Sequence, residues 1–337
     1  MQTRPSERYR SWLIGELALV IVLSIGTLLL FYTGRLDGYA SPNARIVLDT
    51  AVAMMASMVA VLAATRFLVE GRAMDLLLAG GFLAIGLGTF AFAVAPVLSS
   101  SELALGPAEI WAAIGSGLFG AALIAFAPYL SSRTGKRRRA LTVTVALVGA
   151  ALFAIWLDVR YLGIDLESSA AVGIRSPAIV GAYGLLAVLS LVAVVGFGLR
   201  FRRHGRDLDS WLTLALTLVV FADLHDVLAP LRSSVYVLPS DMLRLLAFCV
   251  LLAGVARAIG QAEFGRAVAE ERARVAREIH DGLAQYLFAV LTHASMLENG
   301  APVEEAVPRL KQAAVLAQQE ARFAILALSS ASGTAPE

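Results

Sequence analysis

His280, Asp281 and Gln285 are the side chains in this sequence whose types and spacing are best suited to chemistry. An imidazole can attack or take a proton through one ring nitrogen while the other nitrogen donates a hydrogen bond. Asp281 follows the histidine directly, and Gln285 lies four residues after that aspartate. On a helix this spacing places the aspartate and the glutamine on one face, one turn apart. The pattern therefore predicts a helix that carries a reactive histidine with two polar neighbours.

An amphipathic hairpin is predicted to position these three side chains. Apolar residues recur at spacings of three, four or seven between Val268 and Val290, so they form one stripe on a helix. Asn299-Gly300-Ala301-Pro302 ends this helix, and a second amphipathic helix follows, with Pro308 interpreted as its true start and Ala314 in its apolar stripe. Two helices with a short turn form an antiparallel hairpin. Because one hairpin leaves its stripe exposed, two are expected to pair into a homodimeric four-helix bundle.

The string from Arg274 to Gln285, Arg-Val-Ala-Arg-Glu-Ile-His-Asp-Gly-Leu-Ala-Gln, resembles the phosphoacceptor helix of sensor histidine kinases of the NarL/DesK-type class. The resemblance covers roughly residues 262–330. It implies that His280 attacks the γ-phosphate of ATP and that Asp281 orients the ring and takes up its proton. It implies that Gln285 positions water for dephosphorylation, and that a response regulator receiver domain is the partner. The alternative is an ordinary dimeric coiled coil with an exposed histidine.

ATP with Mg is the cofactor that the resemblance implies, held by a separate ATP-binding kinase domain. The motifs of that domain, an asparagine box and D-x-G-x-G, are not found in these 337 residues. Autophosphorylation by this chain alone is therefore not expected, and whether it acts as a transferase by itself stays open. A separate ATP-binding chain, a longer gene and a decayed gene are the alternatives. The chain itself is expected to bind no cofactor and no metal.

The composition indicates a membrane protein. Hydrophobic residues make up 58% of the chain and charged residues only 16%, whereas a soluble domain is nearer one-quarter charged. A spanning helix needs about 20 largely apolar residues. The sequence has eight such runs, at 12–32, 46–69, 74–97, 109–130, 140–160, 177–200, 210–231 and 241–260.

Basic residues set the predicted topology. Arginine and lysine gather before the first run and in the second, fourth and sixth connections, which by the positive-inside rule lie in the cytoplasm. Both termini are then cytoplasmic, in a bacterial inner membrane, and no cleavable signal peptide is evident. The predicted architecture is all-α: residues 1–260 form an eight-span sensor domain in the lipid bilayer, 261–329 a dimerisation and phosphotransfer hairpin, and 330–337 a linker to the ATP-binding domain.

Ionisable residues within the runs are costly in a bilayer and mark candidate sensing residues. The predicted topology places them at one outer level, where they would line a water-filled pocket for a cation, a proton or a polar ligand; they are Asp49, Asp158, Asp223, His225, Asp226, Asp241 and Arg244. The alternative is that Asp223 or Asp226 pairs with Arg244 to lock the bundle. One histidine with nearby aspartates does not make a metal site.

Three functions are compatible with these features. The first is a homodimeric membrane sensor histidine kinase of a two-component system, phosphorylated on His280 and signalling to a response regulator without binding nucleic acid itself. The second is a transporter or permease with a C-terminal dimerisation coiled coil, which an inverted repeat would favour, although none is evident. The third is a scaffold that dimerises with a full-length kinase.

Overall fold

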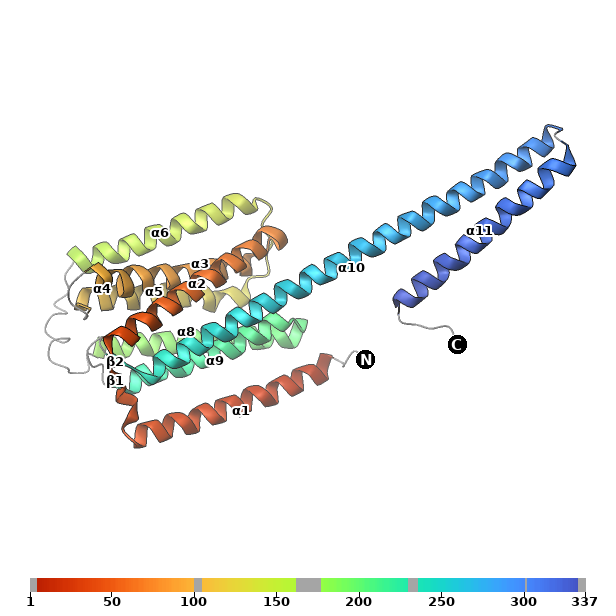
Figure 1. Cartoon of the computed structure of the whole chain (residues 1–337). Coiled ribbons are helices and arrows are strands. Elements are labelled where there is room, and N and C mark those ends of the chain that lie inside the picture. The colour runs from red at the N-terminus through yellow and green to blue at the C-terminus, as the bar shows by residue number, and fades with distance from the viewer. Residues whose placement is uncertain (1–4, 100–104, 162–176, 230–235, 301, 333–337) are drawn as a thin grey trace. The chain divides into compact units, whose positions relative to one another are not determined.

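The computed structural model describes residues 5–99, 105–161, 177–229, 236–300 and 302–332, and it confirms the predicted all-α class (Figure 1). The only strands in these ranges are β1 (Tyr39–Ala40) and β2 (Tyr236–Val237), which pair antiparallel. The helices are α1 (Pro5–Tyr32), η1 (Arg35–Asp37), α2 (Pro42–Glu70), α3 (Ala73–Thr89), η2 (Phe90–Val94), α4 (Ala95–Ser99), α5 (Pro107–Phe126), η3 (Ala127–Tyr129), α6 (Arg137–Tyr161), α8 (Pro177–His204), α9 (Asp207–Leu228), α10 (Pro239–Glu298) and α11 (Val303–Ser332).

Eight segments in the described ranges are long and apolar enough to cross a membrane, as the sequence predicts. Their bounds differ by only a few residues from the predicted runs: Tyr9–Tyr32, Pro42–Glu70, Ala73–Ser99, Ala108–Tyr129, Arg137–Asp158, Pro177–His204, Asp207–Leu228 and Pro239–Gly260. The chain divides into an N-terminal unit, Met1–Ala258, and a C-terminal unit, Ile259–Glu337. Helix α10 contributes to both units, because it continues without a break from Pro239 to Glu298.

The N-terminal unit contains a direct repeat, which differs from the inverted repeat considered above. Arg66-Phe67 at the end of α2 recurs as Arg200-Phe201 at the end of α8, and the glycine, arginine and aspartate that follow recur at the same spacings. The helices correspond in order, so that α2, α3 and α5 match α8, α9 and the first part of α10. Each helix of the second copy lies four predicted spans after its counterpart, an even number, so equivalent helices cross the bilayer in the same direction.

The turns within the two copies have the same conformation. Gly71 ends α2 at a φ of 70° and Gly205 follows α8 at 62°, a left-handed backbone that glycine adopts without strain. The next residues, Arg72 and Arg206, are both extended, with φ values of −82° and −81°. Burial lowers the pKa of Arg206 in the second turn, and so do the charges of Arg72 and Arg200. The repeat therefore extends from sequence to backbone geometry.

Each copy places its first helix against the other copy. Helix α6, the first helix of the second copy, packs on α3 and α5, whereas α1 packs on α9 and α8. Figure 1 shows α1 and α6 at opposite edges of the N-terminal unit. Two polar contacts attach α1 to α9: His225 Nε2 lies 2.8 Å from Thr27 Oγ1, and the Thr217 hydroxyl donates to Glu16. This reciprocal packing is what a two-fold relation between the copies produces.

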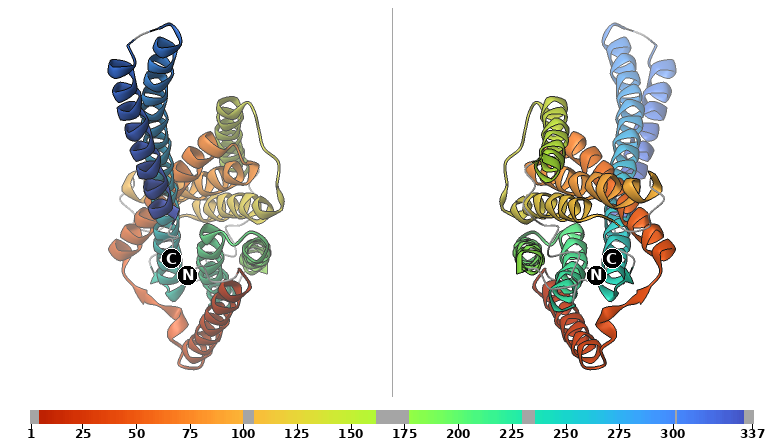
Figure 2. Two further views of the ribbon diagram at one scale, coloured as in Figure 1. Left: turned by 90° about the vertical axis from the view of Figure 1, so that its right-hand side faces the viewer. Right: turned by 90° about the vertical axis from the view of Figure 1, so that its left-hand side faces the viewer.

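The C-terminal unit is a helical hairpin, with the second part of α10 beside α11 (Figure 2). Ala317 of the predicted stripe is buried in α11 at 7% exposure, but Ala314 of that stripe is exposed and Ala313 is buried instead, so the predicted stripe is only partly confirmed. The interpretation of Pro308 as a helix start is wrong, because α11 begins at Val303 and includes this proline. A proline in the second turn removes only one backbone hydrogen bond, which the packing of a 30-residue helix can tolerate.

Close backbone packing of α3 on α5 yields a stability prediction. A methyl group on Gly81 would lie 2.8 Å from the Gly120 carbonyl oxygen, and one on Gly120 would lie 2.7 Å from the Gly81 carbonyl oxygen. We expect Gly81→Ala or Gly120→Ala to destabilise the N-terminal unit by about 1–3 kcal/mol, because rigid helix backbones must separate. Thermal unfolding of the detergent-solubilised chain measures this.

Gly149→Ala on α6 is the matched control, since no atom lies within 4 Å of its added methyl group. The same substitution should there be neutral or stabilising, because alanine favours helix over glycine. Equal unfolding temperatures for all three variants would contradict close packing of α3 and α5.

Candidate functional site

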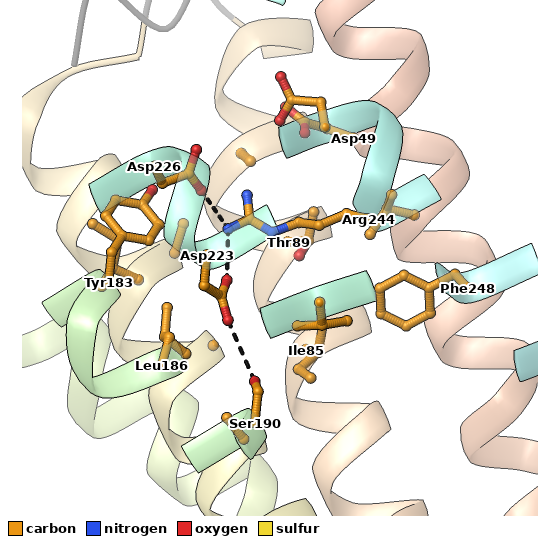
Figure 3. A pocket seen from close by; sticks show the side chains of 18 of the residues that line it. Asp49, Ile85, Thr89, Tyr183, Leu186, Ser190, Asp223, Asp226, Arg244 and Phe248 are labelled. Atoms are coloured by element: carbon orange, nitrogen blue, oxygen red, sulfur yellow. Dashed lines mark hydrogen bonds and ion pairs between the residues drawn. The ribbon is translucent and has the colours of Figure 1, made fainter. Parts of the chain in front are cut away.

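A cavity of about 240 Å³ lies within the N-terminal unit (Figure 3). Helices α2, α3, α5, α8, α9 and α10 all contribute to its walls. Its charged residues come from the first turns of α2 and α10 and the last turns of α9, so they gather at one end: Arg45, Asp49, Asp223, Asp226, Asp241 and Arg244. The remaining walls are largely apolar. The cavity is therefore charged at the end near the two-stranded sheet and hydrocarbon-like further along.

Arg244 joins α10 to α9 at the charged end. Its Nη2 atom lies 2.9 Å from Asp223 Oδ1 and 2.5 Å from Asp226 Oδ2. The Ser190 hydroxyl donates to the other oxygen of Asp223 at 3.3 Å. This is the ion pair of the alternative interpretation, and the same residues also line a cavity. Buried carboxylates need such partners, because an unpaired charge in a low-dielectric interior costs several kcal/mol.

Arg45 makes the equivalent connection between α2 and α10. Its Nε lies 3.0 Å from Asp49 Oδ2, and its Nη1 lies 2.5 Å from Asp241 Oδ2. The backbone N–H of Leu238 also donates to this Asp241 oxygen at 2.8 Å. Arg45 was not among the predicted sensing residues, and it lies just before the second predicted run, 46–69. The spacing of four residues to Asp49 was the signal that could have identified it.

Two of the predicted sensing residues lie outside the cavity. His225 is buried at 4% exposure, but it faces α1 and lines a separate groove that includes Thr27 and Arg35. Asp158 is exposed on α6 and does not line the cavity. Side chains at the same depth in a bilayer need not meet, because the rotation of each helix about its axis sets the direction in which its side chains point. In the described part of the chain, no group of three or more His, Cys, Asp and Glu side chains could hold a metal ion.

The second candidate site lies on α10 in the C-terminal unit. His280, Asp281 and Gln285 are all exposed there, on a helix without internal proline. Gly282 faces α11, since a methyl group on it would lie 3.5 Å from Glu320 Oε1. His280 lies two residues earlier, about 200° around the helix, so it faces away from α11 and its ring is open to an incoming reactant or partner domain.

Ion pairs along the exposed face support this part of α10. Arg274 lies 2.6 Å from Glu271 and 3.0 Å from Glu278, one turn to either side. The hydrogen bond from Arg274 lowers the pKa of the Glu271 carboxyl, so this acid is ionised at neutral pH. Arg277, one turn before Asp281, donates from Nε to the Ala273 carbonyl. Among the described residues, no ion pair joins Arg277 to Asp281.

The comparisons with known proteins bear on this second site. Residues 271–333 match the family model HisKA_3, described as histidine kinase. The match includes the exposed histidine and most of the hairpin, and it confirms the resemblance drawn from the sequence. Neither the search of curated proteins nor the search of solved structures found a significant match.

Removal of the Arg244 guanidinium tests the charged end of the cavity. Arg244→Met leaves Asp223 and Asp226 buried without their shared cation, and we expect it to destabilise the N-terminal unit by roughly 3–5 kcal/mol. Thermal unfolding in detergent measures the loss. Arg257→Met is the control, because this arginine is exposed on the same helix. Adding Asp223→Asn and Asp226→Asn to Arg244→Met should restore most of the stability; no recovery would contradict a charge-based cause.

Proposed function

We propose that this chain is the sensor and phosphoacceptor part of a membrane-bound histidine kinase of a two-component system. The observation that carries the proposal is the match of residues 271–333 to a histidine kinase family, with His280 exposed on α10 inside that match. The eight long apolar helices support a multi-pass membrane location. The distribution of basic residues supports a bacterial inner membrane with both chain termini in the cytoplasm, where ATP is present.

His280 would be the nucleophile. Its Nε2 attacks the γ-phosphorus of ATP with Mg, which an ATP-binding domain outside these 337 residues would hold. The bond from phosphorus to the β,γ-bridging oxygen breaks, ADP leaves, and an N–P bond forms. Asp281 would accept a hydrogen bond from Nδ1–H, which fixes the attacking tautomer, and would take up the ring proton. Its freedom from an ion pair with Arg277 supports this role.

A response regulator receiver domain would then take the phosphoryl group from His280. An acceptor carboxylate of that domain attacks the phosphorus, and the N–P bond breaks. Gln285, one helical turn from Asp281 on the same exposed face, would position a water molecule for hydrolysis of the regulator's acyl phosphate. The chain would thereby both phosphorylate and dephosphorylate the regulator.

The hairpin would act as a homodimer. Large apolar side chains on its outer surface are uncovered in the single chain: Leu287 at 48% exposure, Phe288 at 72%, Leu291 at 68% and Phe323 at 67%. In water a second hairpin would bury this surface as a four-helix bundle. Dimerisation would also bring His280 of one chain near an ATP-binding domain that belongs to either chain.

Transport is the second candidate function, and the direct repeat favours it. Transporters commonly hold substrate between two structural repeats, and the cavity lies between the two copies in this chain. A permease with a dimerisation hairpin would not need His280, whereas a kinase would. Substrate uptake that is unaffected by His280→Gln would favour transport.

Loss of one histidine should abolish phosphorylation. In native host cells, we expect the purified protein to carry acid-labile phosphate, because N–P bonds hydrolyse in acid, and His280→Gln should remove it completely. His293→Gln is the control, since His293 lies on the same helix but is half-buried. Phosphohistidine detection before and after acid treatment measures both variants. Label retained in His280→Gln would overturn the assignment of the phosphoacceptor.

Replacement of Gln285 should impair dephosphorylation of the regulator without impairing phosphorylation of His280. We expect Gln285→Ala to leave phosphorylation of His280 intact and to slow regulator dephosphorylation by roughly 10–100-fold, because a misplaced water costs about this much. The decay of phosphorylated regulator with each variant measures it. Gln318→Ala on α11 is the control, as another exposed glutamine of the hairpin. An unchanged decay rate would remove Gln285 from this role.

A further inference from the structure

The cavity of the N-terminal unit lies between the two copies of the repeat. Equivalent residues of the two copies line it in pairs: Phe82 and Leu216, Ile85 and Val219, Ile114 and Phe248. A pseudo-two-fold axis therefore passes through the cavity. Such an axis is where repeat-built membrane proteins place their binding sites, because neither copy alone encloses the space.

The copies differ where the cavity is charged. Asp223 and Arg244 of the second copy correspond to Thr89 and Ile110 of the first, and all four line the cavity. Arg45 and Asp49 of the first copy correspond to Ile179 and Tyr183 of the second. Charged residues of both copies thus give an otherwise largely apolar cavity one charged end, which is what a ligand with a polar head and an apolar body requires.

The charges at this end do not balance. Four aspartates and only two arginines line the cavity, so the ionised site carries two carboxylates in excess. Arg244 is shared by Asp223 and Asp226, and Arg45 is shared by Asp49 and Asp241. Asp223, Asp226 and Asp241 are buried, so water compensates little of the excess charge. A buried site with two carboxylates in excess attracts a cation.

The walls indicate an organic cation rather than a metal ion. No group of three metal-ligating side chains occurs among the described residues. Beyond the carboxylates the lining is aliphatic and aromatic, with Phe82 and Phe248 in T-shaped contact at 6.2 Å between ring centroids. The ring of Tyr183 lies under the Arg244 guanidinium at 5.8 Å and already serves as a cation–π surface.

We infer that this cavity binds a small amphiphilic organic cation, an amine or quaternary ammonium on an apolar body. The cationic head lies among Asp226, Asp49 and Asp241, and the apolar body extends between the two copies toward Phe82 and Phe248. Bound ligand would add contacts between α10 and α2, α3 and α9. Because α10 also carries His280, the proposed kinase would thereby respond to this ligand, and only this last step depends on the proposed function.

Binding is tested with the full chain in lipid nanodiscs and octyltrimethylammonium as the probe. We expect saturable binding with a stoichiometry of one, measured by calorimetry. Octyl sulfate and octanol keep the chain length and change the head, whereas tetramethylammonium keeps the head and removes the body. All three should bind at least tenfold more weakly. Equal binding of octanol or octyl sulfate would overturn the cationic head, and equal binding of tetramethylammonium would overturn the apolar body.

Variants locate the site. Asp226→Asn should weaken probe binding at least tenfold, whereas Asp158→Asn, the same charge change on exposed α6, should not. If Asp226→Asn fails to fold, Gly117→Leu serves, because Gly117 lines the cavity and an added methyl group would meet only Leu186 at 3.9 Å. It should fill the cavity and abolish binding. Binding that both variants retain would overturn the location. The binding measurement needs neither ATP nor a response regulator. A negative result would therefore contradict the ligand proposal alone and would leave the proposed role of His280 unaffected.

Discussion

The ion pairs of Arg244 with Asp223 and Asp226 are the interaction on which the N-terminal unit most depends. They join the last turns of α9 to the first turns of α10. In hydrocarbon the three side chains cannot be separated without leaving a charge unpaired, so the pairing fixes the relative register of the two helices. Arg45 does the same for α2 and α10 through Asp241. The start of α10 is thus held on two sides by charge.

This constraint also explains why a cavity persists beside the pairs. Two guanidiniums pair with four carboxylates where the repeat copies meet. These ion pairs hold the helices apart, so the helices do not pack into the cavity. Apolar helices without such polar contacts would pack to fill it. Charged residues of both copies give the cavity its one polar end: Arg45 and Asp49 of the first, and Asp223, Asp226, Asp241 and Arg244 of the second.

The two units place their charged and apolar side chains in opposite ways. The N-terminal unit hides its charges in pairs and presents apolar side chains outward, as in Leu29 at 63% exposure and Val47 at 67%, because its surroundings are expected to be lipid. The hairpin presents its charges, such as Arg274 and Glu278, on its exposed surface, and His280 is exposed there as well. One helix, α10, satisfies both environments by a change in residue composition near Gly260 and not by a break in its backbone.

The sequence by itself determined the all-α class, the eight apolar helices and the match of the histidine-bearing hairpin. Each of these depends on local periodicity or on a contiguous string, which residue order contains directly. Tertiary structure alone decided which polar residues of different helices meet. Asp49, Asp223, Asp226, Asp241 and Arg244 come together, whereas His225 and Asp158, at similar depths, do not. Which side chains meet depends on the rotation of each helix about its axis and on which helices pack against each other. Long-range packing determines both, and spacing along the chain does not.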